Sequence, residues 1–348
     1  MLALTCALFL LSLSISGSLL LYAKDIQAFL NPELWQVKFD ESQPKPLTLS
    51  KIIEKIELAP DVKIKLIEHA ENPNHVWSVR LTNNKYLNIN PYTGEVVLEH
   101  SFYDTFYGFV MSWHRWLVYK TKTNETPLKV WMSIASLALI IELLLGFYLW
   151  IKPKKRLKRL KIKWHSKPKI LFYQLHTVVG VFSCIPLILI AFSGMAFQWQ
   201  ATTKQIVELL TFSKVETANY QHIPTKNKDY LNLDKAYKSA KSALPKGVIY
   251  RSYLPLNDKE PLKLRIKMPN ESHAYSWSWA DASTGKHLAS FDASKASLAT
   301  QVWNFKYKFH IGEFIGEPIK LLWLLLSLLP SFFVVSGIYL AVKRWQKK

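Results

Sequence analysis

The chain has 348 residues, of which 49% are hydrophobic and 20% charged, and its mean hydropathy of +0.03 averages two very different kinds of segment. Apolar runs without a charge cover residues 1–23, 170–200 and 321–342, and a fourth run, 130–151, carries one charge, Glu142. About 20 apolar residues cross a bilayer core. We therefore expect four transmembrane helices, and the composition excludes a soluble enzyme.

The formal net charge of +20, from 45 basic and 25 acidic residues, is concentrated beside these runs. The loop 152–169 holds ten Lys and Arg residues and no acid, and the tail 343–348 adds four basic residues. Basic loops mark the cytoplasmic side of a membrane protein. We therefore expect this loop and both termini in the cytoplasm, with the basic side chains on anionic lipid headgroups and not on nucleic acid.

Residues 1–23 could form either a membrane anchor or a cleaved signal peptide. No basic residue precedes the run, and its 23 residues exceed the roughly 7–15 residues of a signal-peptide core. Gly17-Ser18 is the alternative, as a small-residue cleavage site. We favour an uncleaved helix.

Residues 24–105 have the pattern of a small α+β domain outside the membrane. A helix is predicted from apolar residues at amphipathic spacing, namely Leu49, Ile52, Ile53 and Ile56. A turn at 90–94 separates the last two of three predicted strands, 77–81, 86–89 and 95–98.

The segment 201–299 repeats this pattern. Its helix is predicted from Leu233, Ala236, Tyr237 and Ala240. Its strands are predicted at 248–254, 262–267 and 275–279, before a turn at 281–285. Neither segment contains a nucleotide-binding loop or a nucleophile elbow.

Internal similarity indicates that the chain is a duplicated unit. Ser16-Gly17 aligns with Ser193-Gly194 at an offset of 177, and GFYLWIK from Gly146 aligns with GIYLAVKR from Gly337 at an offset of 191. The turn sequence NINPYTGEVV from Asn88 matches WADASTGKHL at the same offset of 191. We expect the four helices to form one bundle around a pseudo-twofold axis along the membrane normal.

The predicted organisation has eight parts. They are a helix at 1–23, a domain at 24–105, an outer-rim helix and second span at 106–151, a basic loop at 152–169, a third span at 170–200, a second domain at 201–299, an outer-rim segment and fourth span at 300–342, and a tail at 343–348.

Within the spans, small and polar residues suggest both packing and function. Gly and Ser near the helix ends favour close helix packing and could also leave room for a flat cofactor. Pro186 and Pro330 are expected to kink the third and fourth helices. Glu142 is either a functional residue or an inward-facing acid paired with a polar neighbour.

Among the ten histidines, His114 and His310 stand 32 and 27 residues before the repeat glycines Gly146 and Gly337. By topology both lie at the outer rim, on opposite sides of the pseudo-twofold axis. Such a pair suits axial ligation of b-type haem, bound without covalent attachment because no C-x-x-C-H motif occurs. The alternative is that each histidine is an interfacial residue with local hydrogen bonds.

The other histidines divide by position. His176 begins the third helix inside apolar sequence, and Pro168 separates it from His165. Six lie in the exterior segments and are expected on the surface or in loops: His69, His75, His100, His222, His273 and His287.

Aromatic residues cluster beside His114 and His310. They are Phe106, Tyr107, Trp113, Trp116, Trp303, Phe305 and Tyr307. Such a belt is typical of a membrane interface. We expect some of them also to form the wall of a haem site, with Arg115 near a haem propionate.

The chain resembles the PepSY-associated transmembrane helix family and, within it, inner-membrane ferric-siderophore reductases of the iron-regulated type. The segments that carry the resemblance are LHTVVG from Leu175, WHRWL from Trp113, FHIGEFIG from Phe309 and GFYLW from Gly146. The resemblance implies a membrane α-helical fold, a four-helix bundle from two repeats with two small periplasmic PepSY-like α+β domains.

The resemblance also implies a function. It is a multi-pass protein of the bacterial inner membrane in which two b-type haems carry electrons to a periplasmic ferric siderophore or other ferric chelate and release Fe(II). His114 and His310 would hold the outer haem, and His176 one side of the inner haem. The electron donor, a quinol or a cytoplasmic reductase, stays open.

The inner haem lacks a second ligand in this sequence. The offset of 177 places the counterpart of His176 at position −1. We expect either that translation begins roughly 10–20 residues upstream, or that the protein binds one haem instead of two.

Two other functions stay open. The protein could be a non-redox, membrane-anchored binding or regulatory protein, because PepSY-like modules are associated with peptidase inhibition. Transport of an iron complex is less favoured, since only four spans occur and they contain no polar row.

Overall fold

The computed structural model describes residues 2–38, 45–220, 232–257 and 260–346. The chain forms two compact units. A helical unit comprises Met1–Ala23, Phe109–Ile206 and Lys306–Lys348, and a sheet unit comprises Lys24–Gly108 and Val207–Phe305.

The described residues contain four helices that are long and apolar enough to cross a membrane, as predicted. They are α1 (Leu2–Leu30), α5 (Lys129–Ile151), α6 (Pro168–Met195) and α10 (Glu317–Trp345). In lipid a helix is favoured because it satisfies its backbone hydrogen bonds internally. The chain is therefore a membrane protein.

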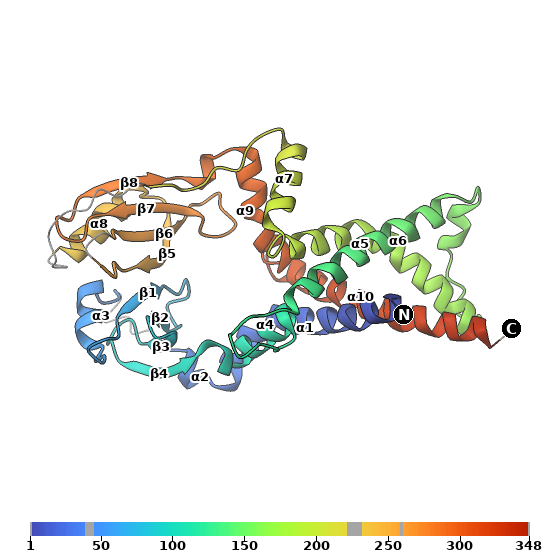
Figure 1. Ribbon diagram of the computed structural model, residues 1–348, viewed down its shortest axis with the longest axis horizontal. Coiled ribbons are helices and arrows are strands. Elements are labelled where there is room, and N and C mark those ends of the chain that lie inside the picture. The colour runs from blue at the N-terminus through green and yellow to red at the C-terminus, as the bar shows by residue number, and fades with distance from the viewer. Residues whose placement is uncertain (1, 39–44, 221–231, 258–259, 347–348) are drawn as a thin grey trace. The chain divides into compact units, whose positions relative to one another are not determined.

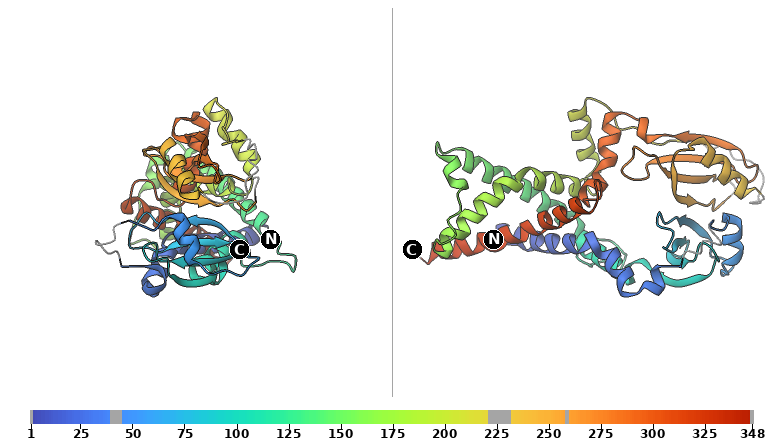
Figure 2. Two further views of the ribbon diagram at one scale, coloured as in Figure 1. Left: turned by 90° about the vertical axis from the view of Figure 1, so that its left-hand side faces the viewer. Right: turned by 180° about the vertical axis from the view of Figure 1, so that it is seen from behind.

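These four helices gather into one bundle (Figures 1 and 2). Leu139 of α5, Leu187 of α6 and Leu326 of α10 are buried in a common apolar cluster. Serines add polar contacts between α1 and α10, since the Ser18 and Ser327 hydroxyl oxygens lie 2.7 Å apart. Small and hydroxyl residues commonly link membrane helices in this way.

The described residues also form shorter α-helices. They are α2 (Pro32–Trp35), α3 (Leu49–Lys55), α4 (Phe106–Trp116), α7 (Gln200–Thr211), α8 (Leu233–Ala243) and α9 (Leu298–His310). Pro186 and Pro330 lie inside α6 and α10, whereas Pro168 is at the start of α6. That start leaves His165 outside the helix that carries His176, as expected.

In the described residues, the sheet unit is built on one antiparallel sheet with eight strands. They are β1 (Ile64–Glu68), β2 (Trp77–Leu81), β3 (Lys85–Ile89), β4 (Val96–Ser101), β5 (Val248–Tyr253), β6 (Leu262–Lys267), β7 (Ser276–Ala280) and β8 (His287–Phe291). Their order is β4-β3-β2-β1-β5-β6-β7-β8.

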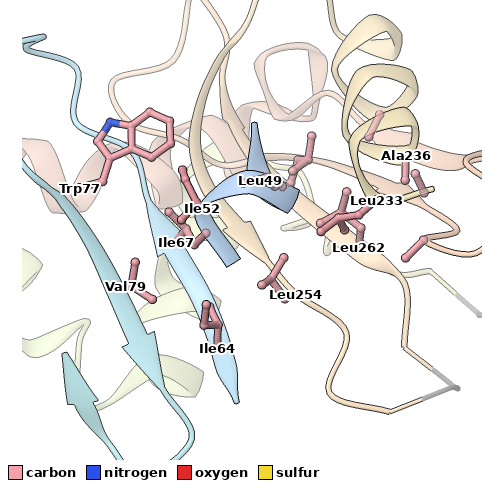
Figure 3. Packing of buried hydrophobic residues seen from close by; sticks show 14 of the residues in the cluster. Leu49, Ile52, Ile64, Ile67, Trp77, Val79, Leu233, Ala236, Leu254 and Leu262 are labelled. Carbon is pink, nitrogen blue, oxygen red and sulfur yellow. The ribbon is translucent and has the colours of Figure 1, made fainter. Parts of the chain in front are cut away.

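A single core fills the sheet unit. Ile67 of β1 and Leu264 of β6 are fully buried, and they share a cluster with Leu49 and Ile52 of α3 and Ala236 of α8. Figure 3 shows side chains of both helices meeting those of the strands. Burying a large aliphatic side chain contributes about 1.5–3 kcal/mol, so this cluster is the main source of the unit's stability.

The sheet joins the two segments that we expected to form separate domains. Antiparallel pairing of β1 with β5 places Leu66 opposite Tyr253 and Glu68 opposite Arg251. Strands of both segments therefore belong to one continuous sheet. The strands β1 and β8 were also not predicted, and each adds a strand to its half.

Candidate functional site

His114 and His310 meet inside the helical unit, although 196 residues separate them in sequence. Their ring centres lie 6.3 Å apart, with ring planes at 47°. Two imidazoles that share one metal at about 2 Å place their ring centres roughly 6 Å apart. The separation therefore matches that of two axial ligands.

Both histidines lie at the C-terminal ends of helices, which fix the positions of their rings. His114 lies in the last turn of α4, which stops where Leu117 and Val118 adopt positive φ angles of 54° and 61°. His310 is the last residue of α9, which ends in a Schellman motif with Gly312 at φ +67°. An added Cβ at Gly312 would lie 2.7 Å from Trp323, so a larger residue would displace this end of the helix.

The Nδ1 atom of each histidine is engaged by a neighbouring span. Nδ1 of His114 lies 3.1 Å from Ser16 Oγ of α1, and Nδ1 of His310 lies 3.1 Å from Ser193 Oγ of α6. Neither Nε2 atom makes a hydrogen bond within the part of the chain that the structure describes. Each ring therefore keeps one nitrogen for another partner.

Glycines bring the spans close to these rings. An added Cβ at Gly17 would lie 3.0 Å from Cε1 of His114, and one at Gly194 would lie 3.0 Å from Cε1 of His310. A side chain at either position would push against an imidazole. The small residues that the repeat aligned thus lie directly against the two histidines.

Both imidazoles are held in the neutral form. Burial lowers the pKa of His114 to about 3, and the nearby His310 acts in the same direction. Burial also lowers the pKa of His310. Neutral imidazole is the form that ligates metals, so no proton has to leave before a metal binds at physiological pH.

A cavity of about 300 Å³ lies beside the histidines, within the helical unit. His114, His310 and both glycines line it, together with apolar side chains such as Leu13, Leu139, Leu187 and Ala191. This volume is at the lower end of the roughly 300–1,000 Å³ range of small-molecule sites. The walls suit a flat, largely apolar cofactor.

Polar groups line the same cavity. Arg115 and Lys129 contribute positive charge, and Gln198 contributes an amide. The guanidinium of Arg115 also lies 5.5 Å from the ring centre of Trp116. A carboxylate at the edge of a bound cofactor would find cationic partners here.

Two imidazoles are too few ligands for a bare metal ion, since protein zinc sites use at least three protein ligands. Within the described ranges, no group of three or more His, Cys, Asp or Glu side chains could hold an ion. Haem iron needs only axial ligands from the protein because the porphyrin supplies the others. The residues present therefore fit haem better than a free ion.

His176 lies elsewhere on α6. Its Nδ1 lies 2.7 Å from Ser336 Oγ of α10, and its ring centre lies 5.2 Å from that of Phe333. Ile190, which contacts His310, lies 14 positions after His176 on α6, so the two histidine sites are about 20 Å apart along this helix.

The expected aromatic wall is only partly present. Trp113 donates from Nε1 to Ser12 Oγ at 2.8 Å and does not line the cavity, and neither does Trp303 of α9. Of the seven aromatic residues expected beside the histidines, only Tyr307 lines it. Phe197 was missed, although it lines the cavity and packs on His310 with ring centres 5.5 Å apart.

Two further expectations need correction. Glu142 is exposed on α5, so it is not an inward-facing acid, and it does not line the cavity. His69 was expected on the surface or in a loop; it follows the end of β1, but it is buried, with Nε2 2.8 Å from Ser252 Oγ and its ring on Trp77. His222 lies outside the described residues.

Comparison with known proteins identifies the family. No curated protein matches the chain. The profile of the PepSY-associated TM region matches residues 1–344, which is nearly the whole sequence. The chain therefore belongs to the PepSY-associated TM region family, as its resemblance suggested.

Proposed function

We propose that the protein is a haem-containing membrane reductase that passes electrons across the membrane to a ferric chelate, such as a ferric siderophore, and releases Fe(II). The observation that carries the proposal is the His114–His310 pair, whose ring centres lie 6.3 Å apart beside an apolar cavity. Haem bound there supplies reversible one-electron chemistry at iron, so each electron reduces one Fe(III) of the chelate.

The residues of the chain bind and orient the cofactor. His114 and His310 would hold the iron through Nε2, because Nδ1 of each ring is occupied by a neighbouring helix. Arg115 and Lys129 would bind the propionates, and Phe197 packs on His310. The apolar walls exclude water from the iron ligands, and this burial tunes the reduction potential.

We place the protein in a bacterial inner membrane, with both termini in the cytoplasm and the sheet unit in the periplasm. The distribution of charge supports this orientation, since ten basic residues lie in the loop 152–169. His176 on α6 lies on the cytoplasmic side of the histidine pair in this arrangement and would be one of the two ligands of an inner haem. A quinol or a cytoplasmic reductase supplies the electrons.

Absorption spectra of the purified full-length protein test the proposal. We expect wild-type protein, expressed with haem supplied, to show haem bands that sharpen on reduction, and to reduce an external ferric chelate. His114→Ala and His310→Ala should each remove the same spectral component and that activity. His287→Ala is the matched control, because His287 is exposed in β8.

The outcomes separate the two main candidates. Colourless wild-type protein would contradict a haem reductase and favour a membrane-anchored binding protein. Full haem content in both single alanine variants would show that this pair does not hold the iron.

A further inference from the structure

Three histidines of the helical unit have the same neighbour, a Ser-Gly dipeptide on an adjacent span. In each case Nδ1 of the ring lies within hydrogen-bond distance of the serine hydroxyl. The pairs are Ser16 with His114 at 3.1 Å, Ser193 with His310 at 3.1 Å, and Ser336 with His176 at 2.7 Å. The recurrence of one arrangement on α1, α6 and α10 calls for a common role.

In all three pairs the serine proton is already committed to its own helix. Ser16 Oγ donates to Ser12 O at 2.6 Å, Ser193 Oγ to Ile190 O at 2.8 Å, and Ser336 Oγ to Phe332 O at 2.7 Å. A hydroxyl has one proton, so the serine oxygen can only accept a hydrogen bond from the histidine. The proton of each neutral imidazole must then be on Nδ1.

A backbone carbonyl leads to the same tautomer of His310 independently. Nδ1 of His310 lies 3.1 Å from Ile190 O, and the backbone of Leu13 also forms a hydrogen bond with the ring of His114. A carbonyl oxygen has no proton to give, so Nδ1 of His310 is again the donor. Leu13 and Ile190 are 177 residues apart, the same offset as Ser16 and Ser193.

Histidines of the sheet unit are arranged differently. Nε2 of His69 lies 2.8 Å from Ser252 Oγ, and Nε2 of His100 lies 3.4 Å from Asn88 Oδ1. In the three Ser–His pairs, no residue that the structure describes forms a hydrogen bond with Nε2 of the histidine. His114, His310 and His176 therefore leave Nε2 without a hydrogen bond from the described residues, whereas His69 and His100 use Nε2 for one.

We propose that Ser16, Ser193 and Ser336 are positioning residues that hold their histidines as the Nδ1–H tautomer, so that the Nε2 lone pair is free to bind haem iron. The part of this inference that concerns iron rests on the proposed function. A hydrogen bond from the distal nitrogen orients a ligating imidazole and makes its other nitrogen more basic.

Loss of a serine should weaken the iron–histidine bond without removing the ligand. Loss of such a hydrogen bond typically lowers metal affinity about 10- to 100-fold. A less basic Nε2 stabilises Fe(III) less, so the midpoint potential should rise. Ser336→Ala should have the largest effect on its histidine, because Ile190 O still accepts from His310 when Ser193 is replaced.

The tautomer can be measured without haem, which separates this inference from the proposed function. We suggest ¹⁵N NMR of histidine-labelled, haem-free, full-length protein in lipid nanodiscs. Wild-type His114, His310 and His176 should each show a protonated Nδ1. Ser336→Ala should give His176 a mixture of tautomers, and Ser336→Thr, which keeps the hydroxyl, should restore the wild-type signal.

Ser183→Ala is the matched control, since Ser183 is buried on α6 and donates to Val179 O in the same way but forms no hydrogen bond with a histidine among the described residues. We expect it to change neither the tautomers nor, in haem-loaded protein, the potential. Protonated Nε2 in wild-type protein, or equal effects of Ser183→Ala and Ser336→Ala, would overturn the role of the serines. Wild-type protein with the expected tautomers but no haem uptake would instead contradict the proposed function alone.

Discussion

Replacement of Gly17 or Gly194 by alanine should disturb the histidine pair specifically. The added Cβ would lie 3.0 Å from Cε1 of His114 or His310, which is closer than carbon atoms normally approach. The ring must move by a few tenths of an ångström, and the Ser-His hydrogen bond at 3.1 Å moves with it. Overpacking of this kind typically costs about 1–3 kcal/mol.

The other two repeat glycines supply graded controls. An added Cβ at Gly337 would lie 4.0 Å from Cε1 of His176, an ordinary van der Waals contact, and one at Gly146 would meet nothing within 4 Å. Alanine should therefore be tolerated at both. At these two positions the greater helix propensity of alanine, about 1 kcal/mol over glycine, is not opposed by a clash.

Haem affinity of the full-length protein is the appropriate measurement. A cost of about 1–3 kcal/mol corresponds to roughly 5- to 150-fold weaker binding for Gly17→Ala and Gly194→Ala. Gly337→Ala and Gly146→Ala should remain within about twofold of wild type. If all four variants bound haem equally well, the close approach of helix and imidazole would not control the site.

Three further predictions concern single residues. Burial lowers the pKa of His69 from 6.5 to about 4, so the unfolded chain binds more protons than the folded chain between these pH values. The free energy of unfolding of the sheet unit should therefore fall by about 3 kcal/mol as pH drops from 6.5 to 4. Urea unfolding monitored by proteolysis should show this pH dependence, and His69→Gln should remove it; a His69→Gln variant with the wild-type pH dependence would contradict the role of His69. Arg115→Gln should shift the haem midpoint potential in a redox titration, and an unchanged potential would argue against a propionate contact. Ile67→Ala should destabilise the sheet unit by about 2–5 kcal/mol in the same urea assay, because Ile67 is fully buried. A loss below about 1 kcal/mol would mean that the surrounding core relaxes into the space left by the side chain.

The sequence by itself determined the membrane spans and identified His114 and His310 as candidate ligands. Apolar runs predict spans reliably because lipid allows few alternatives to a helix, and the four runs correspond to α1, α5, α6 and α10. The alignment of Ser16-Gly17 with Ser193-Gly194 also located the residues that contact His114 and His310. Phe197 could have been found from the same aligned segment, since it lies three residues after Gly194.

Helical phase explains why most of the aromatic residues expected beside the histidines do not line the cavity. Neighbours in sequence point about 100° apart on a helix, so Trp113 faces Ser12 while His114 faces the cavity. Residues three positions earlier share the face of the ring, and Met111 and Tyr307 both line the cavity. Closeness in sequence was the wrong criterion, and helical spacing would have selected better.

Tertiary structure alone decided the sheet and the chemistry of the pair. The segment IKLIE of β1 has weak alternation, and its partner β5 begins 180 residues later, so no local pattern indicates that the two segments share one sheet. Likewise, the sequence places His114 and His310 at equivalent positions, but their ring separation and the nitrogen left free depend on contacts with α1 and α6. The periodicity of apolar residues indicates which face of a helix or strand is buried. Which other helix or strand packs against that face depends on contacts between residues far apart in the chain.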